Sequence, residues 1–459
     1  MRQLCLRMVV FLAVTPILSA QTYTVVHNFG SNSQDAVIPS FSGIIAQSRG
    51  GYLFSTAGGG NDGTLGRAFR IATSGGETTL HTFHSGQQVD AGLTLGTDGQ
   101  YYGTTTTGGG YGHGMIFKMT QSGAITVLYS FHGAADGGNP TAPPIESEAG
   151  DFYGTTTGGS NGWGSVYKIT RYGEFTLLHT FSGSPDGKRP YGPLVQGSDY
   201  YFYGTTELGG THNDAGTIFR VSRSGDYKVI HSFDYTDGAN PFAGLIQASD
   251  GNYYGVTKWG GTMDEGTVIR MTPDYQVKVL YSFLRGNDGG TPTGGLVQAT
   301  DGNLYGTASG YGPYDGGVLF RITLAGTYTV LHNFTTSTGY FPNGALIQHT
   351  NGLLYGMTSS GGVNSEGGQS GAFYSMDVGL KPFVTYLPTY GRAGSVVQIL
   401  GQGFASDSVV KFNGVPANFT AVYPTYIRAF VPGGATTGPI TVTTAGGTLT
   451  SNKVFVVHP

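Results

Sequence analysis

Residues 244–283 read GLIQASDGNYYGVTKWGGTMDEGTVIRMTPDYQVKVLYSF, and this stretch holds four short apolar runs: GLIQA, NYYGVT, GTVIRM and VKVLYSF. The runs are rich in Val, Ile, Tyr and Phe, and the segments between them carry Asp-Gly, Gly-Gly or Pro-Asp. Short β-branched and aromatic runs bounded by such turn residues are typical of β-strands. The stretch therefore predicts a four-stranded antiparallel meander.

The same unit returns about every 50 residues along the chain. A Tyr-Gly pair in the second run marks six copies, and Phe54-Ser55 marks a divergent first copy; the tyrosines are Tyr102, Tyr153, Tyr203, Tyr254, Tyr305 and Tyr355. The third run occurs seven times, starting at Arg67, Met115, Ser165, Thr217, Thr267, Val318 and Ala372. The pattern predicts seven units of four strands.

The fourth run of the last unit is displaced. It is missing after Asp377, and its equivalent TYTVVHNF lies at residues 22–29, nearly identical to TYTVLHNF at residues 327–334. A closed ring explains this displacement, because the N-terminal strand would complete the last sheet and remove the exposed edge. A period near 50 with four strands per unit is typical of a propeller blade. We predict an all-β fold: a seven-bladed β-propeller, residues 21–377, closed by the N-terminal strand.

The repeated motifs are similar to a known family. DGNLYGT at residues 301–307, GTVIRMT at residues 266–272 and VLYSF at residues 279–283 resemble the Gloeo/Verruco-type (GloVer) repeat of secreted and surface proteins from environmental bacteria. The resemblance covers residues 22–377. It implies a propeller and an extracellular setting, and it implies no set of catalytic residues.

The composition changes after Asp377. A short linker, residues 378–382, leads to residues 383–459, where several short strand-like runs surround GQGF at 401–404 and FNG at 412–414. These elements resemble an IPT/TIG domain, an immunoglobulin-like β-sandwich. In bacterial surface proteins, the resemblance implies a spacer, an adhesion module or a glycan-associated accessory.

Residues 1–20 resemble a secretory signal peptide. Arg2 and Arg7 precede an apolar segment that is too short to span a bilayer, and Ser19-Ala20 offers a cleavage site. The single cysteine, Cys5, lies in this segment, so the mature chain would contain no disulfide. We expect a secreted or extracellular protein, with the cell surface as a possible location, and no membrane span after removal of the signal.

The charge pattern argues against nucleic acid as a partner. Residues 1–20 hold two basic residues and no acidic ones, so their removal changes the formal net charge from −4 to −6. The chain also shows no basic stripe. The expected partners are a polysaccharide, a cell-surface glycan or a surface protein.

Two repeated polar features invite a functional interpretation. An Asp-Gly-x-x-Pro motif starts at Asp136, Asp186, Asp237 and Asp288, and the fourth run carries a His or Tyr at His27, His81, Tyr129, His179, His231, Tyr281 and His332. The aspartates could form a ring of cation ligands, or each could bind its own loop backbone. Because the repetition follows the fold, we favour the second interpretation, a structural role for the His/Tyr set, and no metal or cofactor. The G-x-S-x-G match at residues 158–162 lies in a loop and is expected by chance in a Gly-rich chain.

Aromatic residues that do not repeat are better candidates for a ligand site. Trp163, Trp259, Tyr111, Tyr311 and Tyr314 all fall in Gly-rich loops between second and third strands, and His113 falls in the same class of loop. Rings on such loops suit stacking against sugars, or else they pack the loops against adjacent blades. Acidic residues of the same loops indicate no specific pair, and we predict no catalytic residue; they are Asp62, Glu207, Asp214, Asp264, Glu265, Asp315 and Glu366.

Taken together, these features favour a secreted, non-catalytic binding or surface-interaction protein associated with carbohydrate. Two alternatives stay open at this point. One is an extracellular polysaccharide-cleaving hydrolase or lyase that uses loop carboxylates, which needs a close pair of acids in one pocket. The other is a passive scaffold for a protein partner, which would present a Gly-lined face without an aromatic patch.

Overall fold

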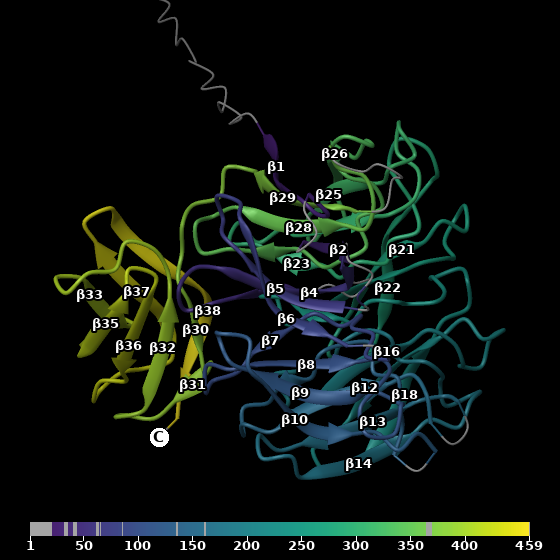
Figure 1. Ribbon diagram of the computed structural model, residues 1–459, viewed down its shortest axis with the longest axis horizontal. Helices are drawn as coiled ribbons and strands as arrows, with labels where there is room; N and C mark the ends of the chain where they lie inside the picture. The colour runs from purple at the N-terminus through teal and green to yellow at the C-terminus, as the bar shows by residue number, and fades with distance from the viewer. Residues whose placement is uncertain are drawn as a thin grey trace, which may run out of the picture.

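The computed structural model describes residues 21–31, 35–39, 44–60, 64, 66–84, 86–134, 136–159, 162–363 and 370–458. The regular structure of these residues is entirely β (Figure 1). No helix long and apolar enough to cross a membrane occurs among them. The predicted signal peptide, Asp62, Glu366 and the centre of the G-x-S-x-G match lie outside the described residues.

Seven antiparallel sheets precede residue 378. Each contains a first, a second, a third and a fourth strand, named by their place in the repeat. The first strands are β3 (Ala46–Gln47), β7 (Thr94–Leu95), β11 (Ile145–Glu146), β15 (Val195–Gln196), β19 (Ile246–Gln247), β23 (Val297–Gln298) and β27 (Ile347–Gln348). The second strands are β4 (Leu53–Gly60), β8 (Tyr101–Thr105), β12 (Phe152–Thr156), β16 (Phe202–Thr206), β20 (Tyr253–Thr257), β24 (Leu304–Ala308) and β28 (Leu354–Thr358).

The third and fourth strands follow in the same order. The third strands are β5 (Gly66–Ile71), β9 (Met115–Met119), β13 (Ser165–Ile169), β17 (Thr217–Val221), β21 (Thr267–Met271), β25 (Val318–Ile322) and β29 (Ala372–Asp377). The fourth strands are β6 (Glu77–Phe83), β10 (Ile125–Ser130), β14 (Phe175–Thr180), β18 (Tyr227–Ser232), β22 (Val277–Ser282), β26 (Tyr328–Asn333) and, from the N-terminus, β1 (Thr22–Asn28).

The last sheet is built from both ends of this region. β1 pairs antiparallel with β29, with Thr22 opposite Asp377 and Asn28 opposite Ala372. The pairing predicted for the displaced N-terminal run is therefore present. The first sheet differs from the prediction of four strands, because a short strand β2 (Ala36–Pro39) pairs with the far end of the long strand β4.

Packing explains the Tyr-Gly marker of the second strands. A Cβ on Gly204 would lie 2.5 Å from the ring of Phe219, which is directly opposite it on β17. Glycine therefore lets the aromatic side chain of the third strand cross the second strand. The preceding Tyr203 is buried, and its hydroxyl donates a hydrogen bond of 2.7 Å to Asp199 in the Asp-containing hairpin before the strand.

Seven apolar clusters join the seven sheets in a cycle. Each cluster combines buried side chains of two sheets: Phe219 with Phe181, for example, in the cluster between the third and fourth sheets. The other neighbouring pairs share clusters in the same way. The last sheet also shares a cluster with the first, in which Phe29 and Phe373 pack with Phe69 and Ile71. The described residues thus form a propeller-like arrangement of sheets (Figure 1).

A repeated side-chain contact joins six of the seven sheets to the preceding one; the exception is the second sheet, whose first strand Thr94–Leu95 carries neither Gln nor Glu. The Gln or Glu of a first strand accepts a hydrogen bond from a backbone N–H in the hairpin of the sheet before it: Gln298 from Ser249 at 2.8 Å, for example. Gln47 of the first sheet accepts from Thr350 of the last sheet at 3.1 Å, across 303 residues. The contact between the two ends of the array therefore follows the internal pattern.

The C-terminal residues form two sheets. One orders β30 (Thr385–Leu387), β32 (Val396–Leu400), β36 (Tyr426–Phe430) and β35 (Phe419–Tyr423); the other orders β31 (Tyr390–Gly391), β38 (Gly447–Val457), β37 (Gly438–Thr444), β33 (Val409–Phe412) and β34 (Val415–Ala417). Val397, Ile427, Val442 and Phe455 from both sheets share one core. This packing makes the unit a β-sandwich, as predicted.

The sandwich contacts the hairpins that join first and second strands (Figure 1). Thr425 donates a hydrogen bond of 2.7 Å to the carbonyl of Arg49, and Gln402 donates one of 2.8 Å to Thr350. A polar cavity of about 780 Å³ lies between the two parts. In an antiparallel sheet the loops between second and third strands leave from the opposite end, so the sandwich leaves that loop face uncovered.

Candidate functional site: the loop face and its central cavity

The loops that follow the fourth strands pair with the Gly-rich loops between second and third strands. The loop after a fourth strand forms a short antiparallel bridge with the Gly-rich loop of the following sheet; the bridges are Gly138–Gly158, Lys188–Leu208, Ala239–Trp259, Gly290–Gly310 and Tyr340–Ser360. At one of them, the N–H of Ala239 donates to the carbonyl of Trp259 at 2.7 Å, and the reverse bond measures 3.0 Å. Backbone pairing therefore stiffens this face.

The aspartates of the Asp-Gly-x-x-Pro motif bind within their own loops. Asp186 accepts a hydrogen bond of 2.8 Å from the N–H of Ser182, and its carboxylate lies 3.2 Å from His179 of the fourth strand. Asp136 contacts Tyr129 and the N–H of His132 in the same way. Burial raises the pKa of the Asp136 carboxyl, but these hydrogen bonds outweigh it and hold the pKa below its usual value. The interpretation that these aspartates bind their own loop backbone is confirmed.

Burial makes one member of this His/Tyr set, His332, sensitive to acid. Tyr23 stacks on its ring with the centroids 3.7 Å apart, and its Nε2 is buried without a hydrogen-bond partner among the described residues. Burial lowers the pKa of His332 to about 4. Below about pH 6.5 this imidazole is protonated in the unfolded chain but stays neutral in the folded chain. The free energy of unfolding therefore keeps the full contribution of His332 above that pH and loses it as the pH drops toward 4.

We expect His332→Phe to reduce this acid sensitivity. The substitution keeps the stack with Tyr23 and removes the group that protonates on unfolding. Between pH 7.5 and pH 4.5, the variant should lose about 1–2 kcal/mol less of its free energy of unfolding than the wild type loses. This value is already reduced for the partial exposure of the ring. Urea unfolding at both pH values measures it. An equal loss of stability in the variant and the wild type would contradict the assignment.

A central cavity of about 480 Å³ opens among the residues that follow the loop prolines. Its wall is mainly apolar, and the rings of Tyr191 and Phe242 stack in it with centroids 4.6 Å apart and planes 17° from parallel. Further around the wall, Thr293 donates a hydrogen bond of 3.2 Å to Asn343. An apolar cavity with a few converging polar groups is the common form of a small-ligand site.

Sequence reasoning missed these cavity residues, although a signal was present. The residue after the loop proline, or after Val89 in one copy, changes from unit to unit while the residues around it repeat; it is Asp90, Thr141, Tyr191, Phe242, Thr293 and Asn343 in six units. A position that varies while the rest of the repeat stays the same is not required to hold one residue type by the packing of the fold. Such a position is where specificity for a ligand can be built.

The predicted aromatic site residues divide into three groups. Trp163 and Trp259 are half-buried, pack against clusters between sheets, and are each covered by a lysine, with Lys188 4.8 Å and Lys258 5.4 Å from the ring centroids. Tyr111 and Tyr314 are 59% and 61% exposed. Tyr311 donates a hydrogen bond of 2.9 Å to the buried carboxylate of Glu265, which also binds Arg285.

One of the five predicted aromatic residues, Trp259, is connected to the cavity wall through a shared lysine. The ammonium group of Lys258 is 5.0 Å from the ring of Phe242 in the cavity wall and 5.4 Å from the ring of Trp259. The structure therefore links Trp259 to the cavity through one lysine. Trp163 and Tyr111 have separate partners, because Tyr111 packs on His132 with centroids 4.0 Å apart.

The loop acids form separate pairs with cations or backbone groups. Lys188 binds Asp214 at 2.7 Å, and the N–H of Gly260 donates to Asp264 at 2.7 Å. Burial raises the pKa of the Glu207 carboxyl, an effect that Arg189 and Lys258 partly offset. Among the described residues that line the cavity, Asp90 is the single carboxylate. The described wall thus lacks the two facing carboxyls that a glycosidase needs.

The fold defines a class: an all-β, propeller-like protein with a C-terminal β-sandwich. Residues 10–159 and 142–373 match the model of the Gloeobacter/Verrucomicrobia repeat, so the chain belongs to this family. Residues 383–457 match the IPT/TIG domain. Both predicted resemblances are confirmed.

Solved structures share the fold at low sequence identity. A streptogramin B lyase aligns with a TM-score of 0.53 and 15% identity, over 78% of this chain and 97% of its own. A fungal alcohol oxidase in complex with copper aligns with a TM-score of 0.53 and 14% identity, over 96% of this chain and all of its own. No match is found among curated proteins. These similarities support the fold and carry no activity to this chain.

Proposed function

We propose that the seven sheets are the blades of a closed seven-bladed propeller, residues 21–377, joined by residues 378–382 to a TIG domain at residues 383–459. The cycle of seven shared clusters supports closure, since the last sheet packs on the first as the others pack on their neighbours. The Gln47–Thr350 contact supports it independently. Closure places the cavity at the mouth of a central channel.

We further propose that the protein is a secreted, non-catalytic binding protein whose ligand enters this cavity from the loop face. The observation that carries the proposal is the Tyr191–Phe242 pair in an apolar wall with threonine and asparagine groups nearby. Aromatic faces pack on the C–H faces of sugar rings, and hydroxyl and amide groups bind the sugar hydroxyls. The ligand class that fits this chemistry is carbohydrate, from a polysaccharide or a cell-surface glycan.

Other features of the face agree with binding rather than cleavage. The exposed rings of Tyr111 and Tyr314 stand on loops of the same class, so they offer additional contacts to an extended glycan. Several weak contacts of this kind act together through avidity. The TIG domain contacts the opposite hairpin side, which leaves the loop face available to a bulky ligand.

The test is binding of soluble oligosaccharides and polysaccharides to the chain lacking residues 1–20, measured by calorimetry and tryptophan fluorescence. We expect saturable binding of one glycan class without product formation. Tyr191→Ala with Phe242→Ala should weaken it at least about 30-fold, since truncation of a buried aromatic anchor costs about 2 kcal/mol or more. Tyr172→Ala is the matched control, because Tyr172 is 84% exposed and sits in a hairpin on the opposite side.

Each other outcome contradicts a defined part of the proposal. Binding that survives the double substitution would place the ligand outside the cavity. Release of shortened sugars would show an enzyme, and Glu207 would then be the first acid to replace. A folded protein that binds no glycan in the panel would overturn the carbohydrate assignment and favour a protein partner.

A further inference from the structure

In several junctions, a residue at the start of the fourth strand, which is its first residue or in β1 its second, packs against the His or Tyr of the preceding sheet. In four junctions this residue is aromatic and stacks on that ring; the pairs are Tyr227 on His179, Tyr328 on Tyr281, Phe175 on Tyr129 and Tyr23 on His332, with centroids 3.6–4.1 Å apart. The tyrosine hydroxyl then donates to a loop carbonyl, as from Tyr227 to Asp186 at 2.8 Å. An apolar stack is thus the common form of this junction.

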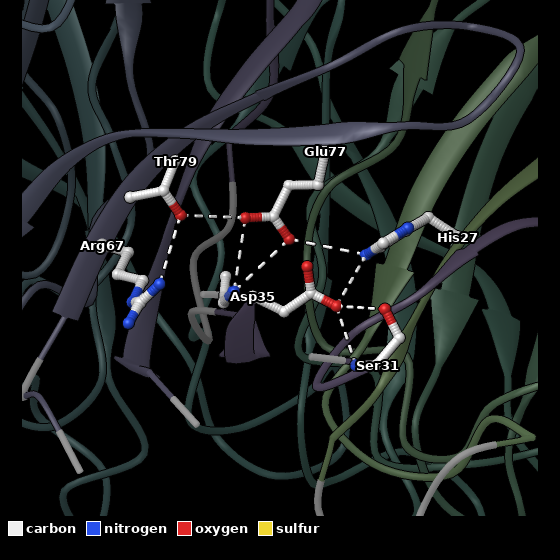
Figure 2. Close-up of polar contacts among 7 residues, drawn as sticks. His27, Ser31, Asp35, Arg67, Glu77 and Thr79 are labelled. Atoms are coloured by element: carbon white, nitrogen blue, oxygen red, sulfur yellow. Dashed lines mark hydrogen bonds and ion pairs between the residues drawn. The ribbon is translucent and has the colours of Figure 1, made fainter. Parts of the chain in front are cut away.

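The junction between the last and the first sheet is built differently. Its fourth strand β6 begins with Glu77, and the carboxylate of Glu77 lies 3.5 Å from Nε2 of His27 on β1. Asp35, just before β2, places its own carboxylate 3.5 Å from the same nitrogen. Figure 2 shows the three side chains pointing toward one another, and one ligand atom from each lies within 4.8 Å of the other two.

These groups are buried. The side chains of Glu77 and Asp35 are 1% and 6% exposed, and that of His27 is 13% exposed. Two carboxylates so close together repel each other when water is excluded, so a cation between them would stabilise the site. The aromatic residue of the other junctions would have avoided this cost, yet the chain places an acid here.

A second layer of hydrogen bonds holds the carboxylates in place. The N–H of Ser31 donates to Asp35 at 2.7 Å, and the N–H of Ala36 lies 3.3 Å from both oxygens of Glu77. Thr79 donates to Glu77 at 3.3 Å and is itself contacted by Arg67 (Figure 2). Such orientation of the ligands by outer partners is a regular property of metal sites.

We propose that His27, Asp35 and Glu77 bind a divalent transition-metal cation, with Zn²⁺ as the best fit. One imidazole and two carboxylates form a mixed nitrogen and oxygen set that suits Zn²⁺, whereas Ca²⁺ takes six to eight oxygen ligands. In a tetrahedral Zn²⁺ site with bonds of about 2.0–2.1 Å, two ligand atoms lie about 3.3–3.4 Å from each other. The two nitrogen–oxygen distances of 3.5 Å are close to this spacing.

The cation would join the N-terminal strand to the first sheet. His27 lies on β1, which completes the last sheet, while Asp35 and Glu77 lie beside and on the first sheet. Metal binding would therefore tie the two ends of the sheet array together. The sequence predicts no metal because the His/Tyr positions cannot converge on one another, and the approach of Glu77 to His27 arises only from the packing of the two sheets.

The test uses the chain from residue 21 to residue 459, without an affinity tag and after treatment with chelator. Calorimetry with Zn²⁺ should give one site per chain, and the melting temperature should rise by about 5 °C or more at saturating Zn²⁺. Ca²⁺ at the same concentration should not reproduce the rise. Glu77→Gln should weaken Zn²⁺ binding by about 100-fold or more, because it removes a charged ligand and leaves the shape unchanged.

Two variants keep the test independent of folding. Glu77→Tyr introduces the residue that three other junctions use, so we expect a folded protein that no longer responds to Zn²⁺. His231→Tyr is the control, because His231 binds Asp237 at 2.8 Å in another junction, and its loss should leave Zn²⁺ binding unchanged. Absence of Zn²⁺ binding by the folded wild type, or equal binding by Glu77→Tyr, would overturn the proposal and leave a buried ion triad.

Discussion

Removal of residues 21–29 is expected to destabilise the protein by at least about 5 kcal/mol and to lower its melting temperature by about 10 °C or more. The deletion removes β1 from the last sheet and takes away Phe29, which is fully buried in the cluster shared by the last and first sheets. It also leaves β29 as an open edge with apolar side chains, so we expect aggregation as well. Thermal unfolding and light scattering measure the two effects.

A peptide of residues 21–31 added in trans distinguishes loss of β1 from general damage. The peptide can pair with the free edge of β29 by strand addition, so it should raise the melting temperature of the shortened chain. The same peptide with Phe29→Asp should fail, because it would bury a charge in an apolar cluster. A chain that lacks residues 21–29 and melts like the chain from residue 21 would contradict closure by β1.

Gly266→Ala is expected to cost about 3–5 kcal/mol. The residue precedes β21 with φ of +98°, and a Cβ there would lie 2.4 Å from the carbonyl oxygen of Thr257 and 2.7 Å from Cδ of Pro292. Thr257 is held in β20 by its pairing with Thr267, and Pro292 lies in the loop that pairs through Gly290 with Gly310, so neither neighbour moves away easily. Chemical denaturation of the variant measures the loss.

Gly251→Ala is the matched control for this prediction. Gly251 has φ of +81° and no atom within 4 Å of an added Cβ. The variant should therefore lose only the free energy that a left-handed backbone costs alanine. That cost is about 1–2 kcal/mol. Similar losses in the two variants would show that the contact with Thr257 and Pro292 contributes nothing. The same spacing recurs before other third strands, as at Gly164, whose Cβ would lie 2.1 Å from Thr156.

The sequence predicted much of the local structure because its causes are local. The Asp-Gly hairpins, the second strands with their Tyr-Gly pairs and the return of the N-terminal run to β29 were all predicted from strand and turn chemistry. The binding of the loop aspartates to their own backbone was predictable too, because Asp186 accepts its hydrogen bond from the N–H of a residue only four positions away. The extra strand β2 was not predicted, because it depends on the length of β4.

The functional candidates were less accessible to sequence reasoning. The five predicted aromatic residues do fall on the loop face, but half-burial of Trp163 and Trp259 under lysines depends on how neighbouring loops pack. Tyr191 and Phe242 stack although they are about 50 residues apart in the chain, in adjacent repeats. No local pattern predicts which repeat positions face a shared cavity.

The sequence by itself therefore determined the all-β architecture, the repeat and the TIG domain, because β-rich apolar runs, turn residues and registered motifs each depend on a few neighbouring residues. The tertiary structure alone decided what converges: the cavity with Tyr191 and Phe242, and the meeting of His27 with Asp35 and Glu77. These contacts join residues far apart in the chain. Their geometry follows from the way whole sheets pack around one another, and no short window of sequence encodes that packing.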